Sequence, residues 1–232
     1  MKYLISILVV VLLQSCNTEM KTRKHIELLL NSQSTEKYVA GIACMEYISQ
    51  PGSDIGYSKN LVKKLFALGF FTEAISAVDV LLTRYPQDPE LYYMHGIAYH
   101  NLLQYGLAVE NLERARKMQP ENKMFSSQSL SVLKEEKVWN EIQALNHSLA
   151  NTTDSFAILL CRADSFFSIR QYDAVLYDLG ALSKMGSASD SLYYTNSVSS
   201  LYQGGGRKSV EILTDMMEHY RTVKARRSYP AN

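Results

Sequence analysis

The stretch that decides the fold is Ile55–Asp88, IGYSKNLVKKLFALGFFTEAISAVDVLLTRYPQD, which is followed directly by Pro89–Asn122, PELYYMHGIAYHNLLQYGLAVENLERARKMQPEN. The second segment repeats the first position by position, without a gap. The matched positions keep residue size as well as polarity, pairing Phe71 with Tyr105, Ala74 with Ala108, Ile75 with Val109, Val78 with Leu112, Leu81 with Ala115, Pro86 with Pro120 and Asp88 with Asn122. A period of this length predicts a helix–turn–helix unit stacked on its own copy.

This pattern resembles the tetratricopeptide repeat. In the register of that family, Gly96 and Tyr99 lie on the first helix of the second unit, and Pro120 lies at the end of its second helix, which carries Ala108, Leu112 and Ala115. The resemblance implies an all-α fold, an α-solenoid of stacked antiparallel helix pairs that forms a TPR-like superhelix. It also implies a surface for partners without built-in chemistry, so we expect a protein that is not an enzyme.

The N-terminus has the layout of an export signal, since Lys2 precedes the apolar run Leu4–Leu13. That run is too short to span a bilayer. The sequence Leu13-Gln14-Ser15-Cys16 resembles the lipobox of bacterial lipoproteins, which implies cleavage before Cys16 and acylation of its new N-terminus. The alternative is an ordinary cleaved signal in which Cys16 is incidental. We therefore expect a lipoprotein signal peptide at 1–15 and a lipidated tether at 16–24.

Apolar periodicity divides the rest of the chain into helical segments. We expect an N-terminal helical pair or degenerate repeat at 25–54, two well-formed units at 55–122, a diverged repeat at 123–154, two further units at 155–220 and a solvated basic tail at 221–232. The alternative for Met124–Leu149 is a break between two short stacks. Short polar residues precede the helical runs and are expected to cap them, namely Asp54, Asp88, Asn122, Asp154 and Asp190.

Charge and motif patterns exclude several classes of function. The chain has 24 Lys and Arg against 23 Asp and Glu, and no cationic stretch precedes the C-terminus, so we expect no nucleic-acid partner. The glycines before Arg207 match neither the spacing nor the context of a phosphate-binding loop. The histidines lack the spacing of metal ligands, and we expect no metal, cofactor or catalytic group. Cys44 and Cys161 are expected to be two separate buried thiols, although a disulfide is left open.

The remaining candidate site is the concave groove that the first helix of each pair lines in the resembled family. The family's register places the following residues there: Lys59, Asn60, Lys63, Phe66, Tyr93, Ile97, His100, Asn101, Phe167, Tyr194 and Tyr202. Lys59, Asn60 and Lys63 echo, in one repeat only, the set with which some family members clamp a peptide carboxylate. Tyr and Phe supply large contact areas at interfaces, but any one tyrosine can equally fill space between helices.

Together these features favour a non-enzymatic scaffold or adaptor, anchored by lipid on Cys16, whose groove binds a protein or peptide segment in the bacterial cell envelope. Asn17 after the acylated cysteine favours the outer membrane. The alternative is a glycan- or small-ligand-binding outer-membrane lipoprotein, similar in kind to SusD-like proteins. An aromatic rim over a pocket would favour this alternative, and an open groove would favour a protein partner.

Overall fold

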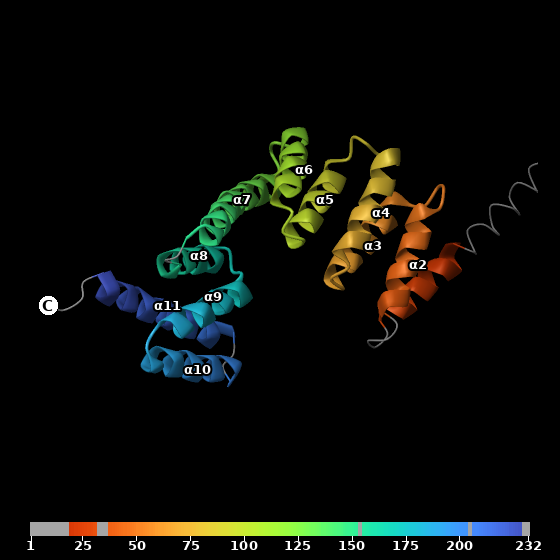
Figure 1. Ribbon diagram of the computed structural model, residues 1–232. Coiled ribbons are helices and arrows are strands. Elements are labelled where there is room, and N and C mark those ends of the chain that lie inside the picture. The colour runs from red at the N-terminus through yellow and green to blue at the C-terminus, as the bar shows by residue number, and fades with distance from the viewer. Residues whose placement is uncertain (1–18, 32–36, 153–154, 204–205, 229–232) are drawn as a thin grey trace, which may run out of the picture. The chain divides into compact units, whose positions relative to one another are not determined.

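The computed structural model describes residues 19–31, 37–152, 155–203 and 206–228, and within these ranges the regular structure is entirely helical (Figure 1). The chain divides into two compact units, Met1–Leu133 and Lys134–Asn232. Their boundary falls inside one long helix, α7, which spans Lys123–Ala150. No helix among the described residues is both long and apolar enough to cross a membrane.

Unit 1 contains the predicted repeat. Residues 19–30 form its first helix, which is followed by α2 (Lys37–Ser49), α3 (Ile55–Ala67), α4 (Phe71–Arg84), α5 (Pro89–Asn101) and α6 (Tyr105–Met118). The boundaries of α5 and α6 fall at the same places in the second repeat as those of α3 and α4 in the first, at both ends of each helix. The helix pairs stack in sequence order, as Figure 1 shows for α3 to α6. The prediction of an all-α solenoid of TPR-like antiparallel helix pairs is therefore confirmed.

The predicted caps explain where the helices of unit 1 begin. Asp54 Oδ1 accepts a hydrogen bond from the Tyr57 amide at 2.6 Å, and Asp88 Oδ1 accepts one from the Glu90 amide at 3.0 Å. Asn122 Oδ1 does the same at the start of α7, at 3.1 Å from the amide nitrogen of Met124. Each oxygen satisfies an amide that has no partner within its own helix. Asp154 lies outside the described residues.

The two helices of a repeat approach closely at Gly96. A Cβ atom built on Gly96 would lie 2.6 Å from Leu112 Cγ and 3.0 Å from the Ala108 carbonyl oxygen, so α5 and α6 leave no room for a side chain there. Ala74 and Ala108 are fully buried at equivalent positions of α4 and α6. Small residues at these places set the short distance between paired helices, which the sequence predicted from their recurrence.

The structure differs from the sequence-based expectation at α7, where a diverged helix pair was expected. Residues 123–150 form one continuous helix with no turn that could separate two helices. The stretch contains neither Gly nor Pro, so nothing in it interrupts helical backbone geometry. Apolar spacing of three and four residues predicted helix correctly, but it could not distinguish one long helix from two short ones.

Unit 2 continues from α7 with α8 (Phe156–Ser168), α9 (Tyr172–Met185), α10 (Ala188–Gln203) and α11 (Gly206–Ser228). Its core gathers residues from α8, α9 and α11, including Leu160, Ala163, Leu179, Met216 and Tyr220. Helices α8 and α9 have the same lengths as α5 and α6 and are joined by a turn of the same length. The N-cap residue of α8 is Ser155, one position later than the expected cap at Asp154.

Asp190 is not the residue before a helix, as the sequence suggested, because α10 already begins at Ala188. It lies in the first turn, where Oδ2 accepts hydrogen bonds from the Ser187 amide at 2.6 Å and from Ser187 Oγ at 2.7 Å. The Asp190 amide in turn faces Ser187 Oγ at 3.3 Å. This reciprocal arrangement is a capping box, and Ser187 is its N-cap.

Three further expectations differ from the structure. Residues 19–24, expected to belong to a tether, are helical. The basic tail was expected to be solvated, but α11 extends to Ser228 and Arg227 packs back on unit 2, with its guanidinium 4.4 Å from the Phe156 ring centroid. Cys44 is buried as expected, and burial raises its thiol pKa to about 11, whereas Cys161 is exposed. Both thiols are free, and they belong to different units.

Candidate partner-binding groove

The candidate groove of unit 1 lies on the first helices of its repeats, α3 and α5, and on the start of α7. Lys63 Nζ on α3 reaches Glu90 Oε1 on α5 at 3.0 Å. Lys59 Nζ lies 2.6 Å from Asp88 Oδ2 and 2.9 Å from Glu90 Oε2. These contacts bring α3 and the N-terminus of α5 side by side, and the four side chains balance in charge. The Lys59 charge is therefore compensated within the protein, which does not favour a carboxylate clamp at this position.

The pKa values of this cluster reflect the same compensation. Burial opposes the charge of Lys59, but its hydrogen bonds with Asp88 and Glu90 outweigh that effect and raise the Lys59 pKa. Burial alone would raise the Glu90 pKa, but hydrogen bonds from Lys59 and Lys63 lower it. Each group is thus held in its charged form by its partners. The cluster joins two successive repeats and does not resemble an acid–base pair poised for catalysis.

The next contact along the groove joins α5 to α7. The Tyr93 ring stacks on the Phe125 ring, with centroids 4.8 Å apart and planes 21° apart. Burial raises the Tyr93 pKa, and the side chain is half-buried. Tyr93 was predicted as a groove residue, and the structure shows that much of its ring area already packs within the protein. Its partner Phe125 was missed, because the residues around it were interpreted only as a diverged repeat or a break between two short stacks.

A cavity of about 730 Å³ opens beside these contacts, along the turns that begin α5 and α7. It is lined by charged and amide side chains together with apolar ones, among them Lys59, Arg84, Tyr85, Pro86, Gln119 and Phe125. Sequence reasoning predicted only Lys59 from this set. The recurrence of Pro86 with Pro120 and of Asp88 with Asn122 could have located it, since equivalent turns of stacked repeats lie along the same edge.

The exposed part of the predicted groove is mainly polar. Asn60, Lys63 and Asn101 are exposed, and Ile97 is half-buried. Asn101 also donates from Nδ2 to the Ile97 carbonyl oxygen at 2.8 Å. These four residues can offer hydrogen bonds and a small apolar contact to a bound chain.

Three predicted groove residues pack instead across the turn between the two helices of their own repeat. Phe66 lies 6.2 Å from Phe71, His100 lies 5.6 Å from Tyr105, and Phe167 lies 5.8 Å from Tyr172, measured between ring centroids. The pairs occupy equivalent positions, since in each the first residue is the penultimate one of its helix and the second begins the next helix. Their recurrence indicates a structural role in closing the helix pair.

The remaining predicted residues lie in unit 2 or outside the description. Tyr194 on α10 donates from its hydroxyl to the Leu176 carbonyl oxygen at 3.1 Å and packs over Gly180, so it joins α10 to α9. The Tyr202 side chain and Cys16 lie outside the described residues. The predicted groove positions thus lie on α3 and α5 in unit 1 and on α8 and α10 in unit 2.

Two observations concern metal binding and nucleophilic catalysis. Among the described residues, no group of three His, Cys, Asp or Glu side chains could hold a metal ion. Ser187, Asp190 and His219 lie together, but Asp190 is the central member, with Oδ1 2.9 Å from His219 Nε2 and Oδ2 2.7 Å from Ser187 Oγ. A nucleophilic triad needs the histidine next to the serine, so this cluster is a helix cap with a histidine partner.

Comparisons with known proteins add little to this geometry. No family model and no curated protein matches the chain. Two solved structures are similar to it: MamA 41-end from Desulfovibrio magneticus RS-1, at 17% identity over 75% of this chain and 95% of the other, and the MamA RS-1 ArsTM double mutant, at 18% identity over 72% and 94%. The TM-score is 0.32 for both, so neither similarity bears on function.

Proposed function

We propose that this protein is a non-enzymatic scaffold of the bacterial cell envelope, anchored through lipid on Cys16, whose unit 1 groove binds a segment of a protein partner. One observation carries the partner-binding part: Asn60, Lys63 and Asn101 are exposed and Ile97 is half-buried on α3 and α5, the first helices of the two repeats. Exposed amides suit an extended peptide, because they can pair with its backbone groups. The lipobox-like sequence before Cys16 supports the anchor.

The scaffold proposal also rests on what holds the groove together. Lys63 and Tyr93 join neighbouring repeats through Glu90 and Phe125, so the surface is organised before a partner arrives. Preorganisation lowers the entropic cost of binding and favours a surface whose work is recognition. A reaction would instead require a set of groups with converging chemistry.

The test places a photoreactive amino acid at Asn60 or at Asn101 in the anchored protein in cells. Both positions should give the same covalent adduct, identified by mass spectrometry, and Ile97→Asp should weaken both. The matched control is Thr83, which is exposed on the second helix of the first repeat. The same adducts at Thr83, or unrelated adducts at Asn60 and Asn101, would show that the groove does not recognise a partner.

The anchor is tested separately by feeding cells a fatty-acid analogue. The wild-type protein should carry the label, whereas Cys16→Ala should lose it and leave the membrane fraction. Equal labelling of both proteins would rule out acylation at Cys16.

A further inference from the structure

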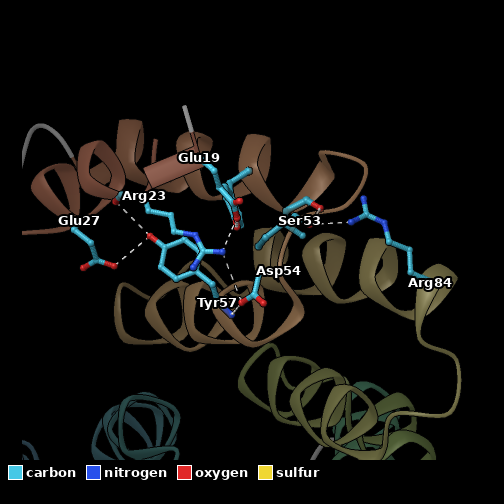
Figure 2. A network of polar contacts seen from close by, with 9 residues as sticks. Glu19, Arg23, Glu27, Ser53, Asp54, Tyr57 and Arg84 are labelled. Atoms are coloured by element: carbon cyan, nitrogen blue, oxygen red, sulfur yellow. Dashed lines mark hydrogen bonds and ion pairs between the residues drawn. The ribbon is translucent and has the colours of Figure 1, made fainter. Parts of the chain in front are cut away.

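Contacts around Arg23 hold the first helix of unit 1, residues 19–30, against α2 and α3 (Figure 2). We call this set of contacts the Arg23 clamp. The Arg23 guanidinium lies 4.5 Å from the Tyr57 ring centroid and 5.6 Å from that of Tyr47. It also donates to Glu19 Oε1 at 2.5 Å and lies 3.9 Å from Asp54 Oδ1. Cation–π contacts and charged hydrogen bonds therefore hold this helix against α2 and α3.

Both acidic residues of this helix are engaged in the same clamp. Glu19 Oε1 accepts a second hydrogen bond from the Tyr47 hydroxyl at 2.7 Å, and these hydrogen bonds, led by that of Tyr47, lower the Glu19 pKa. Glu27 accepts from the Tyr57 hydroxyl at 3.3 Å and pairs with Lys64. The negative charges of the helix are thus compensated on the side that faces the repeats.

The opposite side of the helix carries only basic and apolar residues. At 100° per residue, Met20, Lys21, Lys24, His25 and Leu28 fall within an arc of about 140°, and all five are exposed. The relative exposure is 65% for Met20 and 64% for Leu28, values that are high for large apolar side chains in a packed domain. We call this arc the basic–apolar face. Basic and apolar residues on one helix face are typical of helices that lie on membrane surfaces.

The position of this face relative to Cys16 identifies what it meets. Glu19 follows Cys16 by three positions, and an extended chain spans at most about 3.6 Å per residue, so the helix begins within about 11 Å of residue 16. If Cys16 carries lipid, as the proposed function holds, the helix starts at the level of the headgroups. We propose that the basic–apolar face docks on the bilayer surface itself, with Lys21 and Lys24 contacting anionic headgroups and Met20 and Leu28 entering the interface.

Docking would give the anchored protein a defined orientation, because the Arg23 clamp makes the helix rigid with unit 1. Lipid attachment alone leaves the protein free to tumble about its anchor, whereas a second, electrostatic contact restrains it. The groove on α3 and α5 would then be held at a fixed height and direction above the membrane.

The experiment attaches residue 16 to a bilayer by chemistry, so it does not depend on acylation in cells. The chain from Cys16 to Asn232, carrying Cys161→Ser because Cys161 is exposed, is coupled to maleimide lipid in vesicles. The vesicles contain phosphatidylcholine alone or with phosphatidylglycerol. An amine-acetylating reagent is added, and mass spectrometry follows the labelling of Lys21 and Lys24, with exposed Lys117 on α6 as the internal control.

On vesicles with phosphatidylglycerol, Lys21 and Lys24 should be acetylated several-fold more slowly than in the uncoupled chain, while Lys117 keeps its rate. Met20→Ser with Leu28→Ser should remove most of this protection, and both lysines remain as reporters. Unchanged labelling of Lys21 and Lys24 would overturn the proposal, as would equal protection on the two kinds of vesicle, since proximity alone would then explain it. A negative result in this experiment would not change the outcome of fatty-acid labelling at Cys16, so the two experiments test docking and acylation independently.

Discussion

Arg162 on α8 and Asp178 on α9 form a buried bidentate ion pair, with Nε donating to Oδ2 at 2.9 Å and Nη2 to Oδ1 at 2.5 Å. They occupy the positions that His95 and Asn111 hold on α5 and α6, since each of these residues is the seventh of its helix. His95 Nδ1 lies 3.2 Å from Asn111 Oδ1. In the first repeat the seventh residues of α3 and α4 are Leu61 and Ala77, which are both fully buried.

The two equivalent residues are therefore apolar and buried in the first repeat, a neutral polar pair in the second, and an ion pair in unit 2. The equivalence provides a control for mutagenesis. Two residues that fit together in one helix pair can be substituted at the equivalent positions of another helix pair.

Replacing Asp178 with Ala should destabilise unit 2 strongly. Asp178 is fully buried, and the Arg162 guanidinium, whose side chain is 12% exposed, would keep its hydrogen bond to Asn146 but lose its countercharge. Removing one member of a buried ion pair typically costs about 3–5 kcal/mol of folding free energy. The free energy of unfolding, measured by urea titration, should fall accordingly.

The double variant Arg162→Leu with Asp178→Ala, which installs the pair found at Leu61 and Ala77, should recover most of that loss. Replacing a buried ion pair with apolar residues is often neutral. A double variant as unstable as Asp178→Ala would show that the ion pair is not what the single substitution disturbs.

His95 should make the stability of unit 1 depend on pH. Burial lowers the His95 pKa, and the opposing effects of Asp79 and Asn111 are weaker. Its Nε2 lies 3.5 Å from Asp79 Oδ1 without the alignment of a hydrogen bond. The unfolded chain therefore takes up a proton at a higher pH than the folded one. The stability is fully present above the unfolded pKa of about 6.5 and is lost as pH falls towards the lower folded value.

Urea unfolding at several pH values checks this expectation. His95→Gln should reduce the loss of unfolding free energy between about pH 7 and pH 5, where an ordinary histidine titrates. The matched control is His147→Gln, at an exposed position on α7. If His95→Gln retains the wild-type slope, another group is responsible for it.

The fold was predictable to the extent that the sequence repeat persists. For Ile55–Asn122, the recurring capping residues predicted where α3, α5 and α7 begin, because each repeat makes the same contacts with its neighbour. Lys123–Ala150 lacks these signals, and its apolar spacing fits a helix of any length. Asp190 illustrates a different limit, since a cap and a first-turn carboxylate differ by a small shift along the chain that the sequence alone did not fix.

The candidate site was less predictable than the fold. The register assigned Lys59, Lys63 and Tyr93 to the groove, but their contacts depend on partners from other helices. Glu90, in the first turn of α5, was not among the predicted groove residues, and it contacts both lysines. A sequence indicates on which face of a helix a residue lies. Whether an opposite charge from another helix compensates its charge depends on distances in the tertiary structure.

Ala108→Leu should overpack the contact between α5 and α6. Ala108 is fully buried, and its carbonyl oxygen already lies 3.0 Å from the Cβ position of Gly96. Extra methylene groups in such a contact typically cost about 1–3 kcal/mol. Leu107→Ala, on the same helix but 44% exposed, should change the unfolding free energy by less than about 0.5 kcal/mol. Similar melting temperatures for both variants would contradict the close approach.

The turn between the two helices of a repeat leads to the last prediction. The second residue after the end of α3, α5 and α8 has positive φ, at Gly69 (80°), Leu103 (58°) and Arg170 (60°) respectively. The turn therefore requires a left-handed residue whatever side chain occupies it. Glycine adopts this conformation freely, whereas for other L-residues it costs about 1–2 kcal/mol.

Arg170→Gly should therefore stabilise unit 2. The Arg170 side chain is exposed, so little packing is lost. Glycine also has more conformational freedom in the unfolded chain, which offsets roughly 0.5–1 kcal/mol of the stabilisation. The net increase in unfolding free energy should be about 0.5–1 kcal/mol.

The converse change, Gly69→Ala, should cost a similar amount even though the new Cβ would meet nothing within 4 Å. Gly56→Ala, inside α3 at ordinary helical φ, should instead stabilise unit 1, because alanine favours helical backbone. Opposite signs for Gly69→Ala and Gly56→Ala in urea unfolding are the decisive result. A Gly69→Ala variant that is not destabilised, or a destabilised Arg170→Gly, would mean that the positive φ of this turn carries no strain.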